Sequence, residues 1–252
     1  MNVTLPTELL AGFLLALVRT SAWLVVTPPF NSNAIPQRVK FGLSASLALV
    51  LAPTVTLDPT LFQFWPFATA VAYQAFVGLV LGFAVYLIFA VVQIAGELVD
   101  LQSGFSAASL YDPFTNAAAT PIGRLYQLMA VTLLFAINGH LLLVRGFVNS
   151  YQAAPLSGVT LEAVASLFTT ELGRFLMSAV EIAAPLVAAL FLAELAMGLL
   201  NRAAPQMNVL TIGFIVKILL ALLLVGVALP LLPGAVEGLL GDALTSMTRL
   251  TG

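Results

Sequence analysis

Six long stretches of almost uninterrupted apolar residues constrain the fold of this chain more than any other feature. They cover approximately residues 8–27, 41–57, 67–96, 124–146, 173–201 and 209–232. A helix needs about 20 apolar residues to cross the roughly 30 Å hydrocarbon core of a bilayer. With 61% hydrophobic and only 8% charged residues, the chain cannot cover a water-soluble globule with polar surface. We therefore predict an all-α membrane protein.

The six stretches differ in length, and this difference bears on the topology. The first, fourth and sixth suit one crossing each, while the second ends near Pro53 and is marginal. The third and fifth are about 29–30 residues long, so they would tilt, kink or project from the lipid. A short amphipathic helix is expected around 161–172.

The distribution of Lys and Arg gives an orientation if all six stretches cross the membrane. One side then carries Arg38, Lys40, Arg124 and Arg202, and the other carries Arg145, Arg174 and Arg249. This small excess predicts that the first side is cytoplasmic and that the N-terminus lies outside. The N-terminus lacks the basic region of a signal peptide, so the first stretch should be retained.

Several classes of function are disfavoured by what the chain lacks. A net charge of −2 argues against nucleic-acid binding, which needs clustered Lys and Arg. The absence of Cys excludes disulfides, Cys-ligated zinc and thiol catalysis. His140 is the only histidine, and we expect it to form a hydrogen bond at a helix end. Since no metal or nucleophile motif is present, we expect no enzyme activity, no metal and no cofactor.

Charged side chains inside apolar stretches need a partner or a function. The candidates are Arg19, His140, Glu181, Glu194 and Lys217. If the last two stretches form an antiparallel hairpin about residues 203–206, Glu194 lies about eleven residues before its centre and Lys217 about twelve after. At about 1.5 Å per residue the two lie at nearly equal depth, which predicts an ion pair. It would fix the register of the hairpin, with a direct role in transport as the alternative. Glu181 faces only Pro230, so its partner should come from elsewhere or from another subunit.

Glycines and one loop complete the set of candidate positions. Gly78 and Gly82 lie four residues apart, a spacing that favours close helix packing over ligand binding. Gly96 and Gly104 are further candidates for packing or hinge positions. Residues 101–114 read LQSGFSAASLYDPF, a loop whose bulky apolar side chains are unsuited to water. Such a loop must be packed in protein or line a cavity.

The chain resembles the FliR family of the flagellar type III export apparatus. The resemblance is carried, in order, by RTSAWLVVTPPFNSNAIPQRVKFGLSASLALVLAP, GLVLGF, AGELVDLQSGFSAASLYDP, LLFAINGHLLLV and GLLNRAAPQMNVLTIGFIVKILLALLLV. Members of this family often have Glu where this chain has Gln74, and Met where it has Ser103. The first difference removes a polar group that could pair between subunits, and the second leaves room for the homologous virulence branch.

The resemblance implies one membrane domain spanning 1–252, in which 1–172 is FliP-like and 173–252 is a FliQ-like hairpin. Long hairpins of such subunits pack side by side with FliP and FliQ in a helical export gate. FlhB-like and FlhA-like proteins are the next partners, and unfolded proteins are the substrates. The implied location is the bacterial inner membrane, in the flagellar basal body.

The resemblance also makes the loop at about 99–122 a plug in the pore of the gate. The implied plug residues are Phe105, Leu110, Tyr111, Asp112, Pro113 and Phe114. Two alternatives remain: a virulence secretion gate, and a transporter of small molecules or ions. The transporter is disfavoured because Glu181, Glu194 and Lys217 all lie in the C-terminal third, with no matching set in the first half.

Overall fold

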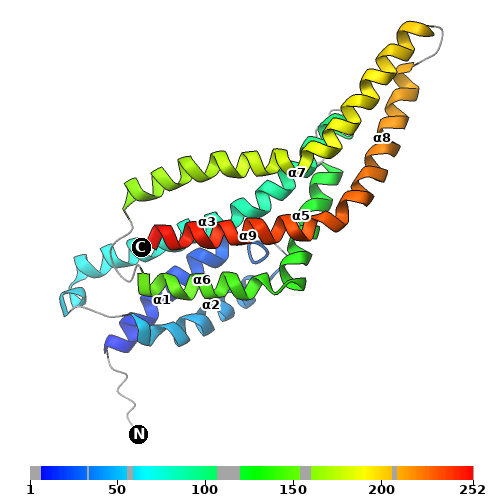
Figure 1. Ribbon diagram of the computed structural model, residues 1–252. Helices are drawn as coiled ribbons and strands as arrows, with labels where there is room; N and C mark the ends of the chain where they lie inside the picture. Colours follow the sequence, from blue (N-terminus) through cyan, green and yellow to red (C-terminus); the bar gives the residue numbers. More distant parts are fainter. Residues whose placement is uncertain are drawn as a thin grey trace. The chain divides into compact units, whose positions relative to one another are not determined.

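A computed structural model describes residues 7–32, 34–55, 59–106, 120–153, 160–205 and 209–251. Every regular element within these ranges is a helix (Figure 1). The prediction of an all-α chain is therefore confirmed for the described residues. The α-helices are α1 (Thr7–Val26), α2 (Gln37–Leu51), α3 (Phe64–Ser103), α5 (Pro121–Ala136), α6 (Gly139–Ala153), α7 (Leu161–Ala203), α8 (Val209–Ala228) and α9 (Leu232–Thr251). Short 3₁₀ turns occupy Ala52–Thr54, Pro59–Phe62 and Leu229–Leu231.

Membrane-spanning length is reached by fewer segments than the six apolar stretches of the sequence. Within the described ranges, four segments are long and apolar enough to cross: Thr7–Val26, Phe64–Ser103, Val164–Ala203 and Ile212–Asp242. The bent pair of α5 and α6 makes a fifth if it is counted as one span. The helix in the second apolar stretch, α2, has only 15 residues, short of the about 20 that a crossing needs. The described residues therefore offer four or five segments of spanning length, compared with the six apolar stretches that the predicted orientation assumes to cross.

The breaks between helices explain further differences from the sequence prediction. The fourth apolar stretch bends by 77° between α5 and α6. There Asn138 adopts a φ of +56°, a left-handed conformation that Asn tolerates better than most residues. The expected separate helix around 161–172 is instead the start of α7, which runs for 43 residues and includes Pro185. Helix α9, beyond the last apolar stretch, was not expected.

The chain divides into two compact units. The first unit consists of the chain up to Leu87, Asn138–Glu171 and the chain from Leu240 onward. The second unit consists of Ile88–Ile137 and Leu172–Leu239.

In the first unit, α1 packs against α2 and against the first half of α3. Gly78 and Gly82 face α1 so closely that an added Cβ would lie 2.9 Å from Ala22 Cβ and from the Trp23 carbonyl oxygen, respectively. The indole of Trp23 stacks on the Phe147 ring of α6, with 4.4 Å between ring centroids. Small residues thus let the α1 and α3 backbones meet, and α6 supplies aromatic packing.

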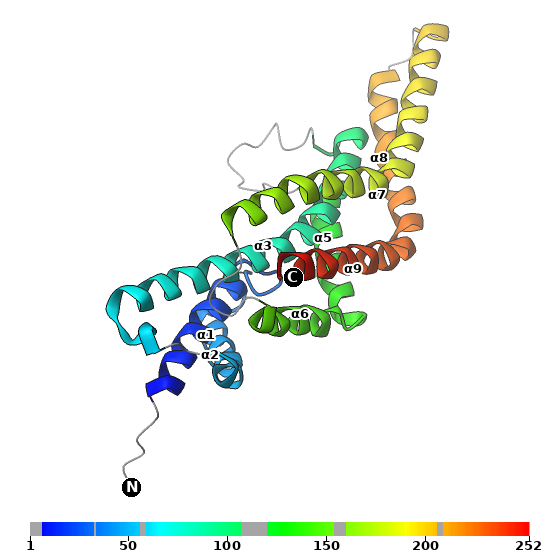
Figure 2. The same ribbon diagram turned by 60° about the vertical axis from the view of Figure 1, so that its left-hand side comes forward.

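The second unit contains the antiparallel hairpin of α7 and α8 together with the end of α3 and all of α5 (Figure 2). The first turn of α5 lies against the last turns of α3, because Gly96 and Gly123 allow backbone contact. This arrangement brings the residues on both sides of the 107–119 segment near one another.

Candidate functional site

The C-terminal end of α3 is fixed by Gly104. This residue has a φ of +93°, which residues with a Cβ rarely adopt, and its N–H donates to the Asp100 carbonyl at 3.1 Å. A left-handed glycine of this kind is a common way to terminate a helix. Phe105, the first of the predicted plug residues, follows it and is half-buried. Leu110, Tyr111, Asp112, Pro113 and Phe114 lie outside the described residues.

A buried carboxylate joins this end of α3 to the beginning of α5. Asp100 is fully buried, and its two oxygens accept hydrogen bonds from the backbone N–H groups of Ile122 and Gly123, at 3.1 and 2.8 Å. Negative charge is favoured at a helix N-terminus, where backbone donors point outward without partners. The side chain at the N-cap position, Thr120, forms no capping hydrogen bond. Asp100 therefore replaces the local cap and ties together the two ends of the 107–119 segment.

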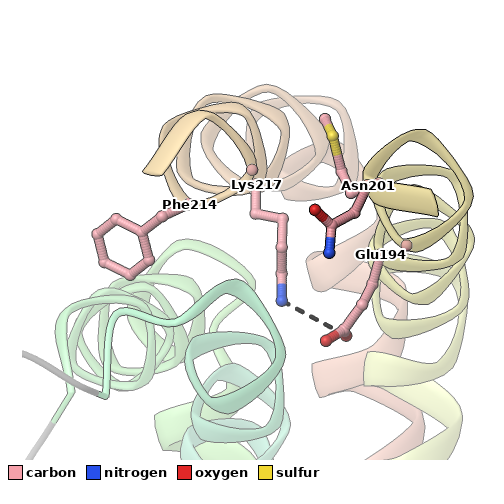
Figure 3. Close-up of a pocket in the computed structure, with 7 residues that line it drawn as sticks. Glu194, Asn201, Phe214 and Lys217 are labelled. Atoms are coloured by element: carbon pink, nitrogen blue, oxygen red, sulfur yellow. Dashed lines mark ion pairs between the residues drawn. The ribbon is translucent and has the colours of Figure 1, made fainter. Parts of the chain in front are cut away.

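A second polar contact connects the end of α3 to the α7–α8 hairpin. Lys217 Nζ lies 3.4 Å from Glu194 Oε2, and the same oxygen accepts a hydrogen bond from Gln102 Nε2 at 2.9 Å (Figure 3). The Lys217 side chain is 18% exposed and that of Glu194 is 55% exposed. One carboxylate thus joins three helices, with α8 supplying the cation and α3 an amide.

A pocket of about 320 Å³ surrounds this ion pair. It is also lined by Met197, Gly198, Asn201, Gly213 and Phe214. In Figure 3 the Lys217 side chain extends from α8 toward Glu194, while Phe214 points away from the pair. A Cβ added to Gly104 would lie 2.9 Å from Phe214 Cε2, so the aromatic ring packs against the turn that ends α3. The pocket therefore adjoins the C-terminal end of α3.

The first unit contains a separate buried polar cluster around Arg19. This side chain is fully buried, and its Nε donates to the Gln74 side-chain oxygen. Its Nη1 donates to the Ser150 carbonyl at 3.1 Å, and its guanidinium carbon lies 4.3 Å from the centre of the Tyr151 ring. Arg19 of α1 thus contacts α3 and α6 at once, by a hydrogen-bonding and cation–π geometry that suits Arg better than Lys.

The remaining predicted residues are dispersed. His140 lies half-buried in the first turn of α6 and takes part in an interaction with another residue. Glu181 is exposed on α7 and lines a second pocket, of about 280 Å³. Sequence reasoning missed the Asp100 bridge and the contacts of Arg19 with Ser150 and Tyr151. One sequence pattern could have indicated the contact of Asp100. It is an acidic residue near the end of a long apolar stretch, followed by a stretch of loop-like composition and a proline.

The chemistry available at these positions is that of hydrogen bonds and ion pairs. Among the described residues, no group of three or more His, Asp or Glu side chains is placed to hold a metal ion. The polar groups around Glu194 and Asp100 bind backbone and side chains of the protein itself. The Asp100 cluster therefore positions α5 on α3, and the Glu194 cluster positions the α7–α8 hairpin on the end of α3.

Comparison with known proteins gives a consistent relationship over most of the chain. Residues 10–243 match the family model described as bacterial export proteins, family 1. The flagellar biosynthetic protein FliR of Escherichia coli K12 is 32% identical over 90% of this chain and 87% of its own length. FliR of Bacillus subtilis 168 is also 32% identical, over 96% and 95%. The Yop proteins translocation protein T of Yersinia pestis is 29% identical over 85% and 84%.

Proposed function

Because the chain belongs to the family of bacterial export proteins, family 1, we propose that it forms the pore of a flagellar protein export gate together with FliP-like and FliQ-like subunits. The relationship to FliR proteins makes it a membrane component of a type III export apparatus, which confirms the resemblance noted in the sequence. The pore passes unfolded proteins across the bacterial inner membrane at the flagellar basal body. Proteins like FlhB and FlhA adjoin the gate.

In this proposal, the segment that contains Leu110, Tyr111, Asp112, Pro113 and Phe114 acts with Phe105 as an apolar plug. What supports it is the fixation of both ends: Asp100 bonds the α5 N-terminus, and Gly104 packs against Phe214. Non-helical backbone at membrane depth is tolerated when it lines a pore or is packed in protein.

The two-part organisation read from the sequence also belongs to this proposal. Residues 1–172 act as the FliP-like part, and 173–252 act as a FliQ-like hairpin within one membrane domain. Helices α7 and α8 form an antiparallel hairpin, which supports the second assignment. The role of the Glu194–Lys217 pair is to hold the register of this hairpin, a steric and structural task that needs no catalytic residue.

Co-expression with the FliP-like and FliQ-like chains of the same bacterium tests the proposal. After extraction in mild detergent, affinity purification of this chain should recover both partners in one complex. In addition, deletion of its gene should abolish flagellar filaments. The barrier function of the inner membrane should not change. Recovery of the chain alone, with uptake of a small solute into vesicles that contain it, would contradict the proposal and support a transporter.

A virulence secretion gate is the second candidate, and the match to the Yersinia protein favours it. That match has lower identity and coverage than the match to FliR of Escherichia coli, 29% over 85% against 32% over 90% of this chain. A function in flagellar export is therefore preferred over one in virulence secretion. Deletion that leaves motility intact but stops secretion of virulence proteins would reverse this preference.

A further inference from the structure

Glu181 occupies an unusual position for a charged residue. It lies in α7 within a segment apolar enough to cross a membrane, and it is exposed. Its exposed neighbours Met177 and Val180 are 61% and 50% accessible and apolar. An ionised carboxylate inside a membrane is costly unless a cation or hydrogen-bond donors face it. The position of Glu181 therefore requires a partner group.

The second acid on the same helical hairpin has such a partner, whereas Glu181 has none among the described residues. Glu194, thirteen residues further along α7, has Lys217 at 3.4 Å on α8. Glu181 lines the second pocket. The other lining residues include Tyr126, Ile182, Leu186, Leu231 and Leu232. Apart from the hydroxyl group of Tyr126, these side chains contribute apolar surface, and the pocket lining contains no cation. The acid thus stands beside an unfilled apolar hollow of about 280 Å³.

We propose that this face of α7 docks a membrane helix of another export apparatus subunit, and that this helix carries a Lys or Arg opposite Glu181. The cation pairs with the carboxylate, and an adjacent apolar side chain of the same helix fills the hollow beside Pro185 and Leu231. This inference rests on the proposed function, because the partner helix is taken from the same apparatus. It adds the residue that specifies where the partner binds.

Charge complementarity favours a different chain over a second copy of this one. In the described spanning helices, Arg19 is buried and bound to Gln74 and Ser150. Lys217 already faces Glu194. Arg174, on α7 itself, also has an interaction of its own, and Arg202 lies in the last turn of α7, at the far end from Glu181. A second copy would have to break one of these contacts to supply Arg19, Arg174 or Lys217. A subunit with its own intramembrane Lys or Arg supplies one without that loss.

Co-purification with the apparatus subunits tests the contact through Glu181→Gln, which keeps the shape and removes the charge. We expect at least about tenfold less partner subunit per chain, since a partner cation left without its anion costs more than the about 1.4 kcal/mol that tenfold represents. The matched control is Glu162→Gln, the same change at an exposed acid in the first turn of α7. It should leave partner recovery unchanged.

Charge reversal separates docking from folding. Glu181→Lys should lose the partner, and changing the facing Lys or Arg of the partner to Glu should restore it. Because the chain contains no Cys, a single Met177→Cys variant also permits specific cross-linking to cysteines placed in the partner helix. A cross-link to another apparatus subunit supports the inference. A cross-link between two copies of this chain, or to another part of the same chain, overturns it.

The outcomes also distinguish this inference from the proposed function. If the wild-type chain recovers its partners and Glu181→Gln recovers them equally well, the docking role of Glu181 is wrong and the gate proposal stands. If the wild-type chain recovers no export subunit at all, the proposed function fails and the inference fails with it.

Discussion

The backbones of Gly96 on α3 and Gly123 on α5 are in direct contact. A Cβ placed on Gly96 would lie 2.8 Å from the Gly123 Cα and equally close to the Ile122 carbonyl oxygen. Both neighbouring atoms belong to the backbone, so neither can rotate away as a side chain can. This contact allows α5 to begin beside Asp100, whose carboxylate then binds the Gly123 N–H at 2.8 Å.

Gly96→Ala should therefore destabilise the second unit. The added methyl group forces α3 and α5 apart, an overpacking effect that typically costs about 1–3 kcal/mol. The thermal unfolding midpoint of the protein in detergent, followed by circular dichroism, measures the change. Gly226→Ala is the control, because nothing lies within 4 Å of a Cβ at that position in α8. If the Gly96→Ala variant has the same unfolding midpoint as the wild type, the helices can move apart without a loss of stability.

Asp100→Asn should loosen the two ends of the 107–119 segment. Asn keeps one acceptor oxygen but turns an amide NH₂ toward the second backbone donor, so one charge-assisted hydrogen bond is lost, worth about 1.5–3 kcal/mol. We expect a lower unfolding midpoint and faster protease cleavage between residues 106 and 120. Glu162→Gln, the corresponding amide change at an exposed acid in the first turn of α7, is the matched control. Equal cleavage rates in both variants would rule out a holding role for Asp100.

The sequence allowed the fold class and the family to be predicted because both depend on extended patterns. Apolar runs of about 20–30 residues identify membrane helices, and an ordered set of motifs identifies the relationship to FliR. The bend at Asn138 was missed because a single left-handed residue hardly alters the hydropathy of its surroundings. Helix α9 was missed because it lies beyond the apolar stretch that ends near residue 232.

Some contacts of the candidate site could also be predicted from the sequence, and others could not. Glu194 and Lys217 are related by simple counting from the centre of a hairpin, and their charged atoms lie 3.4 Å apart. Asp100 and Gly123 are separated by 23 residues in the sequence, and no periodicity relates them. Arg19 and Ser150 are 131 residues apart, so only the three-dimensional arrangement of α1 and α6 brings them together.

Arg19→Lys should destabilise the first unit although it keeps the charge. A single ammonium cannot reproduce the arrangement of donors that reaches both Gln74 and Ser150, and it stacks less well on Tyr151. Loss of one buried hydrogen bond to a charged group predicts about 1.5–3 kcal/mol, measured as a decrease in the thermal unfolding midpoint. Arg38→Lys, at an exposed position of α2, should leave the midpoint unchanged. Equal midpoints for the two variants would argue against the three-helix role of Arg19.

Lys217→Ala should weaken the α7–α8 hairpin, because it removes the cation that faces Glu194. Since the Glu194 side chain is 55% exposed, the expected cost is discounted from that of a fully buried pair to about 1–2 kcal/mol. The double variant Lys217→Ala with Glu194→Ala should recover most of this loss, because the carboxylate without its cation is then absent. Thermal unfolding of the wild type, both single variants and the double variant gives the coupling energy. Additive effects would mean that the two residues do not interact in solution.

Shortening Phe105, Leu110, Tyr111 and Phe114 to Ala should make the assembled gate leak ions at rest. In the proposed plug these bulky apolar side chains fill the pore, and small residues leave a path that water and ions can enter. The measurement is the ion conductance of the purified complex in planar bilayers. The matched control changes Leu141, Leu142, Leu219 and Leu222 to Ala, since these are exposed apolar residues on α6 and α8 that the proposal does not assign to the plug. If the plug variant assembles fully and its conductance equals that of the control, the barrier of the gate lies elsewhere.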